Sequence, residues 1–139
     1  MPDVKGAHQT AALPWRRAAD GSVEILLITS RETQRWVIPK GWPMAGKSGA
    51  ASAAQEAYEE AGVRGEVSPV AIGSFTYDKI AKTGVAKRLT VFVFPLEVAQ
   101  MLDDWPEYGQ RARDWFPAAD AAPRVNEPEL QALIARFSP

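Results

Sequence analysis

The sequence predicts an α/β protein, and two kinds of pattern support this prediction. Long runs rich in β-branched, aliphatic and aromatic residues, such as 23–31 and 85–98, are bounded by turn-forming residues and favour β-strands. Two other segments favour helices, one through its alanine content (49–61) and one through an apolar repeat of three and four residues (127–137). We therefore expect a sheet with helices packed against it.

The composition narrows the class of protein. The chain has 139 residues, which suits a single domain over 1–139, with residues 1–6 as a flexible arm. A net charge of −1 provides no field to attract nucleic acid or an anionic membrane, so we expect neither partner. The absence of cysteine excludes disulfides and thiolate metal sites, and the single histidine, His8, argues against a histidine-rich metal site. Without a signal peptide or about 18 consecutive apolar residues, the chain is expected to be cytoplasmic.

Two strands are expected near the N-terminus, at 8–17 and 23–31, joined by the turn residues 19–21. Residues 25–28 (ILLI) form a continuous apolar run, which predicts a strand that is buried on both faces. Pro14 has no backbone N–H to donate, so it favours an edge position or a bulge for the first strand.

The remaining elements follow in order. We expect a short strand 36–38, a loop 39–43, a helix 49–61, an extended segment 63–77, a hairpin end 78–84, a strand 85–98, a short strand 114–116, a short helix 117–122 and a last helix 127–137. The last helix carries Leu130, Leu133, Ile134 and Phe137 at the spacing of a buried stripe.

The helix 49–61 has an acidic face that needs an explanation. Ser48 is a suitable N-cap, and Glu56, Glu59 and Glu60 fall within an arc of about 100° on an α-helix. Like charges at these spacings repel one another, and nothing nearby on the helix neutralises them. A hard divalent cation would do so, since such ions prefer oxygen ligands. The alternative is a solvated acidic face.

The stretch from Gly41 to Val63 resembles the Nudix box, G-x5-E-x7-R-E-U-x-E-E-x-G-U, where U is a bulky aliphatic residue. The matching positions are Gly41, Glu56, Glu59, Glu60, Gly62 and Val63. Lys47 stands in place of a glutamate and Gln55 in place of the arginine, while Ala57 is smaller than the usual aliphatic residue. Gln55 still has an amide to donate to Glu59 at i,i+4, but without a charge, and we expect a rate about tenfold lower as a result.

The resemblance implies a Nudix fold, an α/β/α sandwich with a central mixed β-sheet. It also implies an enzyme that hydrolyses a phosphoric anhydride bond with Mg²⁺ or Mn²⁺. The implied metal ligands are Gly41, through its loop carbonyl, with Glu56, Glu59 and Glu60. Glu59, Glu60 and a general base, best assigned to Glu107 with Asp104 as the second choice, are the implied catalytic residues. The alternative for Glu107 is a surface carboxylate on a loop.

Several basic residues are candidates for binding substrate phosphates. The sequence W-x-x-P-K-G before the box resembles Nudix enzymes that act on highly phosphorylated substrates, and it makes Lys40 a phosphate contact. Lys47 lies near a helix N-terminus, where phosphates are favoured. Trp42, in the same loop, is the tryptophan best placed to touch ligand. Basic residues also cluster at the hairpin, namely Lys79, Lys82, Lys87 and Arg88. The alternatives are an exposed lysine at position 40 and a charged hairpin that resists aggregation.

A second, looser match covers the segment from Asp104-Trp105 through Arg111 to Trp115-Phe116 and Asp120-Ala121, which resembles diphosphoinositol polyphosphate phosphohydrolases. The function so implied is hydrolysis of a small phosphorylated substrate, either a diphosphoinositol polyphosphate or a dinucleoside polyphosphate. Two alternatives remain open: an impaired Nudix module that binds or senses a phosphorylated ligand, and an RNA 5′-end pyrophosphohydrolase. Many Nudix proteins are homodimers, but nothing in this sequence decides the oligomeric state.

Overall fold

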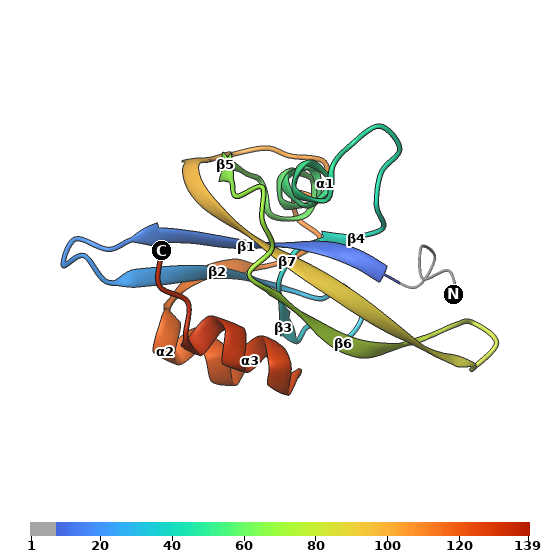
Figure 1. Cartoon of the computed structure of the whole chain (residues 1–139). Coiled ribbons are helices and arrows are strands. Elements are labelled where there is room, and N and C mark those ends of the chain that lie inside the picture. Colours follow the sequence, from blue (N-terminus) through green and yellow to red (C-terminus); the bar gives the residue numbers. More distant parts are fainter. Residues whose placement is uncertain (1–7) are drawn as a thin grey trace.

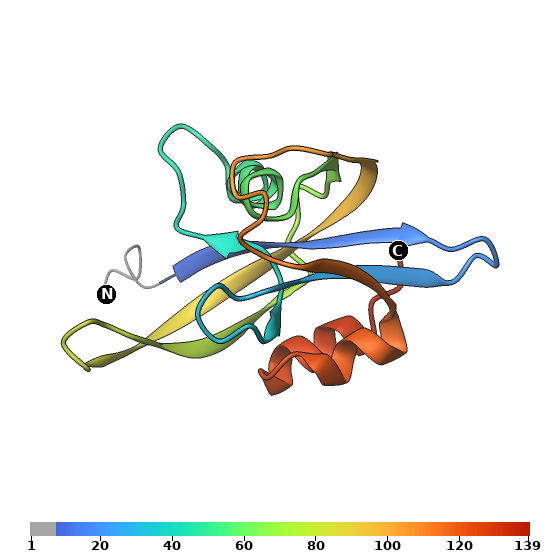
Figure 2. The same cartoon turned by 180° about the vertical axis from the view of Figure 1, so that it is seen from behind.

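A computed structural model describes residues 8–139, so the expected arm at 1–6 lies outside the described residues. Figures 1 and 2 show one twisted sheet between two groups of helices. The strands are β1 (His8–Arg17), β2 (Val23–Thr29), β3 (Trp36–Val37), β4 (Lys40–Gly41), β5 (Val63–Val67), β6 (Gly73–Ile80), β7 (Ala86–Met101) and β8 (Arg113–Pro117). The helices are α1 (Gly49–Glu56), the π-helix η2 (Ala57–Ala61), α2 (Ala118–Ala121), the 3₁₀ helix η3 (Ala122–Arg124) and α3 (Pro128–Ala135).

The sheet is mixed, and β1 lies at its centre. β1 pairs with β7 in parallel and with β2 and β4 in antiparallel fashion, while β5 and β6 both pair with β7 and β8 pairs with β2. The mixed sheet and the α/β/α layering therefore confirm the predicted fold class. The N-terminal hairpin was also predicted correctly, since β1 and β2 begin at the expected residues.

The first strand was expected to lie at an edge or to contain a bulge at Pro14. The edge position was wrong, and the register with β7 shows no shift at Pro14. Pro14 pairs with Leu96 of β7 in the middle of the sheet. On its other side, β1 pairs with β4 only at Thr10 and Ala11 and with β2 only from Trp15 onward. Pro14 therefore occupies the gap between these two ladders, where no backbone donor is required.

Two apolar cores lie on opposite faces of the sheet, and β2 contributes to both. Ile25 and Leu27 pack on the face covered by α2 and α3, and Leu26 and Ile28 pack on the face covered by α1 and η2. Figure 1 shows these helices on the two sides of the sheet. The alternate burial explains the unbroken apolar run of this strand.

The helices meet the sheet with different side chains. The α3 stripe, Leu130, Leu133 and Ile134, is buried as predicted, with Phe137 packed against the same core. The α1 and η2 side uses only alanines at Ala50, Ala53, Ala57 and Ala61. Small side chains let the backbone of this helix lie close to the sheet. This short distance determines how far from the sheet the glutamates of the helix lie.

Some boundaries differ from those predicted. The loop expected at 39–43 contains β4, a two-residue strand that pairs with β1. The extended segment expected at 63–77 is divided into β5 and β6. The hairpin strands reach beyond the expected limits, because β6 runs to Ile80 and β7 to Met101. Among the described residues, no helix has the length and apolar character required to cross a bilayer.

Candidate active site

The helix that carries the three box glutamates changes its winding in the middle. Ser48 caps its start, accepting a 3.1 Å hydrogen bond from the amide of Ala51. The helix is α-helical only to Glu56, so the regular α-helix predicted through Ala61 was wrong for the last five residues, which form the π-helix η2. The chain then leaves through Gly62, whose φ of 67° is left-handed and favours glycine. A π turn at this point is consistent with a functional site, where such turns are frequent.

Glu56 and Glu60 form a hydrogen-bonded pair at the centre of the site. Burial, together with the hydrogen bond to Glu56, raises the pKa of Glu60 to about 9, while the nearby Arg111 guanidinium opposes the shift. Burial also raises the pKa of Glu56, although the hydrogen bond from Glu60 favours its charged form. Without a cation, Glu60 therefore keeps its proton at neutral pH and donates it to the Glu56 carboxylate.

Glu59 has a different partner. Its Oε2 accepts a 2.8 Å hydrogen bond from Gln55 Nε2, which is the i,i+4 contact predicted for the residue in place of the box arginine. Within residues 8–139, no three carboxylate or histidine side chains already surround a common point as a full ligand set would. Glu59 nevertheless lies near enough to Glu56 to raise its pKa.

The donor set fits a hard divalent cation. Two carboxyl groups meet in a buried place and share a proton, with Glu59 and Glu107 close enough to raise the pKa of Glu56 as well. The carboxyl groups of this cluster outnumber the Arg111 guanidinium that reaches them, and a cation with oxygen preference would displace the shared proton.

Gly41 of β4 lies directly against Glu56. A Cβ atom at this position would collide with Oε2 and Cδ of the Glu56 side chain. β4 also brings the backbone N–H of Lys40 to 3.4 Å from Glu60 Oε1. The short strand thus determines where both carboxylates lie.

We expect Gly41→Ala to displace the Glu56 carboxylate and to weaken Mg²⁺ binding about 10- to 100-fold, the range typical of disturbed groups around a metal site. The measurement is calorimetric titration with Mg²⁺. Gly46→Ala is the matched control, because a Cβ there meets no atom within 4 Å. Its positive φ of 76° adds backbone strain, so its melting temperature must be measured as well. Unchanged Mg²⁺ affinity in Gly41→Ala would contradict this placement of Glu56.

The loop between β7 and β8 delivers two further charged groups to the glutamates. The Glu107 backbone N–H donates a 3.0 Å hydrogen bond to the carbonyl of Glu59. Arg111 Nε lies 3.0 Å from Glu107 Oε1, and Arg111 Nη2 lies 3.8 Å from Glu60 Oε1. Arg111 is nearly buried and also donates to the carbonyl of Thr29, 3.2 Å away. Glu107 therefore lies beside the box helix, while Asp104 is exposed.

A strongly basic hollow adjoins this carboxylate cluster. Its volume is about 490 Å³, and its lining consists of Ser30, Arg31, Glu32, Thr33, Arg35, Lys40, Lys79 and Arg111. Lys40 and Arg111 belong both to the hollow and to the surroundings of Glu60. Burial lowers the pKa of Lys40, with the Glu60 charge acting in the opposite direction, and its Nζ lies 4.7 Å from the centre of the Tyr77 ring. Of the five cations in the lining, Arg35 is paired with Glu127 and Arg111 with Glu107. The other three, against one glutamate in the lining, still favour an anionic occupant.

The other predicted phosphate contacts lie outside the lining of this hollow. Lys47 and Lys82 are exposed, and Trp42 is also exposed at 43%. Arg88 forms an exposed ion pair of 3.0 Å with Asp78, its cross-strand neighbour. Lys87 is the cross-strand neighbour of Lys79, so these two side chains share a face of the hairpin.

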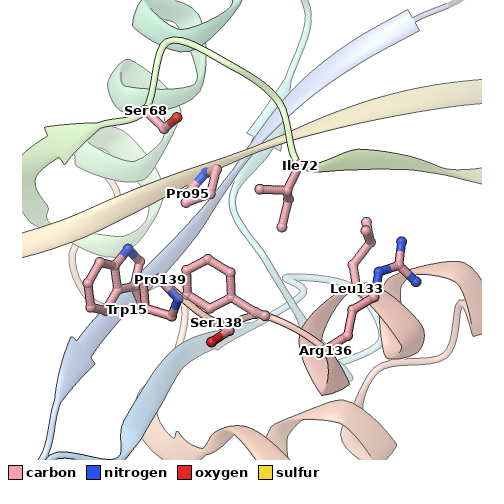
Figure 3. A pocket seen from close by; sticks show the side chains of 9 residues that line it. Trp15, Ser68, Ile72, Pro95, Leu133, Arg136, Ser138 and Pro139 are labelled. Carbon is pink, nitrogen blue, oxygen red and sulfur yellow. The ribbon is translucent and has the colours of Figure 1, made fainter.

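The other tryptophans of the site region have structural roles. Trp36 packs edge-on against Phe116, and Trp105 packs edge-on against Tyr108. A separate apolar hollow of about 460 Å³ lies between β1, β7 and α3, lined by Trp15, Ser68, Ile72, Pro95, Leu133, Arg136, Phe137, Ser138 and Pro139 (Figure 3). None of the carboxylates described above lines it, so it is distinct from the candidate active site.

Comparison with known proteins decides the family. The model of the NUDIX domain matches residues 7–137. The chain belongs to the NUDIX domain family. It is 31% identical over 121 residues to diphosphoinositol polyphosphate phosphohydrolase 3-alpha of Mus musculus, covering 86% of this chain and 70% of that protein. The same enzyme type gives a further match in Rattus norvegicus, diphosphoinositol polyphosphate phosphohydrolase 2, at 30% identity over 122 residues, covering 86% of this chain and 63% of that protein.

The fold is also that of solved Nudix structures. The Ap4A hydrolase of C. elegans superposes with a TM-score of 0.62 at 22% identity, covering 92% of both chains. The dihydroneopterin triphosphate pyrophosphohydrolase of E. coli superposes with a TM-score of 0.69 at 15% identity, covering 94% of this chain and 93% of that chain. The predicted Nudix fold and Nudix hydrolase class are thereby confirmed, as is the resemblance to diphosphoinositol polyphosphate phosphohydrolases.

Four arginines that lie near the carboxylates or the hollow were not among the predicted site residues. Arg31 and Arg35 line the basic hollow, Arg111 contacts the carboxylates, and Arg113 contacts the end of η2. Arg111 was visible within the second resemblance, but its closeness to Glu60 depends on the pairing of β8 with β2, two strands far apart in the sequence.

Proposed function

We propose that this Nudix chain is a divalent-cation-dependent pyrophosphohydrolase that cleaves a phosphoric anhydride bond in a small, phosphate-rich molecule. The observation that carries this proposal is the contact between the basic hollow and the carboxylate pair. Lys40 and Arg111 border both, so a substrate held in the hollow by its phosphates would bring an anhydride bond to Glu56 and Glu60. The names of the relatives, with diphosphoinositol polyphosphate and Ap4A among the molecules named, support a substrate of the inositol pyrophosphate or dinucleoside polyphosphate class.

Glu56, Glu59, Glu60 and the Gly41 carbonyl would hold Mg²⁺ or Mn²⁺. When bound, such an ion supplies positive charge to the phosphoryl oxygens and makes a bound water more acidic. Lys40, Arg31 and the other cations of the hollow orient the substrate and stabilise charge that develops on the phosphoryl group.

Glu107 is the proposed general base. Its Oε1 accepts a 3.0 Å hydrogen bond from Arg111 Nε, which fixes the orientation of the carboxylate. Its Oε2 is then the atom that takes a proton from the attacking water. The backbone bond from Glu107 to Glu59 keeps this atom near the carboxylate pair.

Kinetics over a substrate panel test the proposal. The panel contains inositol pyrophosphates, dinucleoside polyphosphates, nucleotide sugars and nucleoside triphosphates, each with Mg²⁺ and with Mn²⁺. We expect kcat/KM to be highest for the most phosphorylated substrates and to fall with ionic strength, because exposed charges are screened by salt. Binding without product release would favour a module that binds or senses a phosphorylated ligand. A preference for triphosphorylated RNA ends would favour an RNA 5′-end pyrophosphohydrolase.

The basic hollow gives a second, more specific expectation. Arg31→Gln and Lys79→Gln remove charges from the hollow without touching the carboxylates, so KM should rise about tenfold, a factor worth about 1.4 kcal/mol, while kcat stays near that of the wild type. Arg136→Gln removes the same charge from the residue that follows α3, outside the site, and is the control for net charge. An equal rise in KM for Arg136→Gln would reject the hollow as the substrate site.

A further inference from the structure

Arg113, the first residue of β8, joins three segments at the end of the box helix. Its Nη1 donates to the carbonyl oxygens of Ala61 and Gly62, at 2.9 and 3.1 Å, and its Nη2 donates to the carbonyl of Leu102 at 2.7 Å. These oxygens belong to the last residue of η2, to the residue that follows it, and to the start of the loop that carries Glu107. The last carbonyls of a helix have no partners within the helix, and a cation is favoured there.

Trp105 completes this junction. The Arg113 guanidinium carbon lies 4.1 Å from the centre of the Trp105 ring. Gly62 packs so closely against both groups that a Cβ there would collide with the Trp105 ring and with Arg113 Nη1. Trp105 therefore fills the space between the helix end and the loop, and only glycine leaves room for it.

Two backbone hydrogen bonds tie the loop to the same helix. The Leu102 N–H donates to the Gly62 carbonyl at 2.8 Å, and the Glu107 N–H donates to the Glu59 carbonyl at 3.0 Å. Between these two points, Trp105 and the guanidinium of Arg113 hold the loop against η2. The position of Glu107 relative to the carboxylates therefore depends on this junction.

The chemistry of the junction requires an arginine. A guanidinium presents a planar array of donors that reaches three oxygens while its face lies on an aromatic ring, whereas a lysine ammonium cannot do both. Burial among these carbonyls and against the Trp105 ring lowers the pKa of Arg113. Arg113 does not line the basic hollow, so its role is separate from substrate binding.

We infer that Arg113 is a positioning residue, which acts with Trp105 to fix the Glu107 loop on the end of η2 and thereby sets the distance from Glu107 to the Glu56–Glu60 pair. The catalytic part of this inference rests on the proposed function, because it assigns Glu107 to the reaction. The structural part does not, since it concerns the docking of the loop alone.

The test uses Arg113→Met and Arg113→Lys, with Arg16→Met as the matched control. Arg16 also lies over a tryptophan, with its guanidinium carbon 4.1 Å from the Trp115 ring, but its hydrogen bond goes to Glu24 of β2 and not to the Glu107 loop. Because a misplaced base slows chemistry without removing phosphate contacts, we expect kcat to fall about 30-fold in Arg113→Met with KM within about twofold of the wild type. Arg113→Lys should recover part of this loss, and Arg16→Met should leave both constants unchanged.

A double-mutant cycle shows whether the effect passes through Glu107. In a Glu107→Gln background, Arg113→Met should lower kcat less than about threefold, since the group it positions is already gone. The same loss in both backgrounds would overturn the inference and indicate general damage to the fold. If Arg113→Met does not fold, Arg113→Lys is carried through the same cycle.

Amide hydrogen exchange provides a readout that needs no substrate. The Glu107 N–H should exchange at least about tenfold faster in Arg113→Met than in the wild type or in Arg16→Met, while amides of β1 keep their protection. Unchanged exchange at Glu107 overturns the positioning role whether or not the protein is a hydrolase. A wild type that hydrolyses nothing in the panel, together with faster exchange in the variant, would reject the proposed function and support the docking role.

Discussion

Replacing Glu60 by glutamine will lower turnover about a hundredfold to a thousandfold and, in the absence of a divalent cation, will make the protein more stable above about pH 5. The loss of turnover is expected because an amide cannot supply the negative oxygen that a cation needs, and removal of one charge-stabilising group from a reaction centre typically costs a hundredfold to a thousandfold. The gain in stability is expected because the native fold holds Glu60 in a place that disfavours its charged form.

The sign of the pH effect follows from the raised pKa. Glu60 titrates near pH 9 in the folded protein, against an ordinary value of 4.5. Between these values the folded state keeps a proton that the unfolded state has lost, so the contribution of Glu60 to stability is full below about pH 4.5 and is lost as pH rises toward 9. The glutamine of the variant does not titrate, and the advantage of the variant over the wild type should therefore grow across this range.

Thermal unfolding at pH 5, 7 and 9, with a chelator and with Mg²⁺, measures both effects. With chelator at pH 9, Glu60→Gln should melt at least about 3 °C above the wild type, the change expected for about 1 kcal/mol in a domain of this size. With Mg²⁺ the order should reverse, because the cation stabilises only the protein that binds it. Glu24→Gln, a carboxylate on β2 paired with Arg16, is the control. A wild type more stable than Glu60→Gln at pH 9 in chelator would contradict the assignment of the buried proton.

The parts of this fold that follow from local patterns were predictable. The apolar run of β2 predicts burial on both faces because alternate side chains point to opposite faces of a sheet. The spacing of Leu130, Leu133 and Ile134 predicts one buried face of α3 for the corresponding helical reason. Glu56, Glu59 and Glu60 were found because their spacing depends on a single helix.

The parts that depend on tertiary structure were not predictable in the same way. A π-helical turn such as η2 has no characteristic amino-acid composition by which it could be predicted. The carbonyls of Glu59 and Ala61 accept hydrogen bonds from the β7–β8 loop and from β8, which lie far away in the sequence. Pro14 favoured an edge strand, yet a gap between two ladders tolerates it at the centre of the sheet. The positive charge beside the acidic face of the helix could not be predicted from neighbouring residues, because it belongs to Arg111 of the β7–β8 loop.

Replacing Arg111 by methionine is expected to give the second large effect, a fall in kcat of about a hundredfold together with at least about tenfold weaker Mg²⁺ binding. Methionine keeps much of the length of the side chain but removes the cation that bonds Glu107 and lies 3.8 Å from Glu60. Glu107 is left beside two other carboxyl groups without its partner, and the pKa of Glu60 should rise further, because Arg111 now lowers it. A cation must then displace a more tightly held proton.

Stability should fall as well, by about 3 kcal/mol, since loss of one partner from a buried ion pair leaves the other charge unpaired. Calorimetric Mg²⁺ titration, steady-state kinetics and urea unfolding measure the three quantities. Arg88→Met is the control for stability, because its pair with Asp78 is exposed and screened by solvent, so its loss should change stability little. Equal losses of stability in the two variants would show that Arg111 is not held in the cluster as the structure indicates.

A second substitution tests whether Arg111 supplies the charge that the box lacks at position 55. Gln55 donates to Glu59 on the same helix, so an arginine there would return a cation to the same group of carboxylates. Gln55→Arg should therefore recover about tenfold of the kcat lost in Arg111→Met, and should change the wild type much less, because Arg111 already neutralises part of the cluster. An equal gain in kcat in both backgrounds would mean that positions 55 and 111 act independently. The glutamine in place of the box arginine would then lower kcat by itself, without compensation from Arg111.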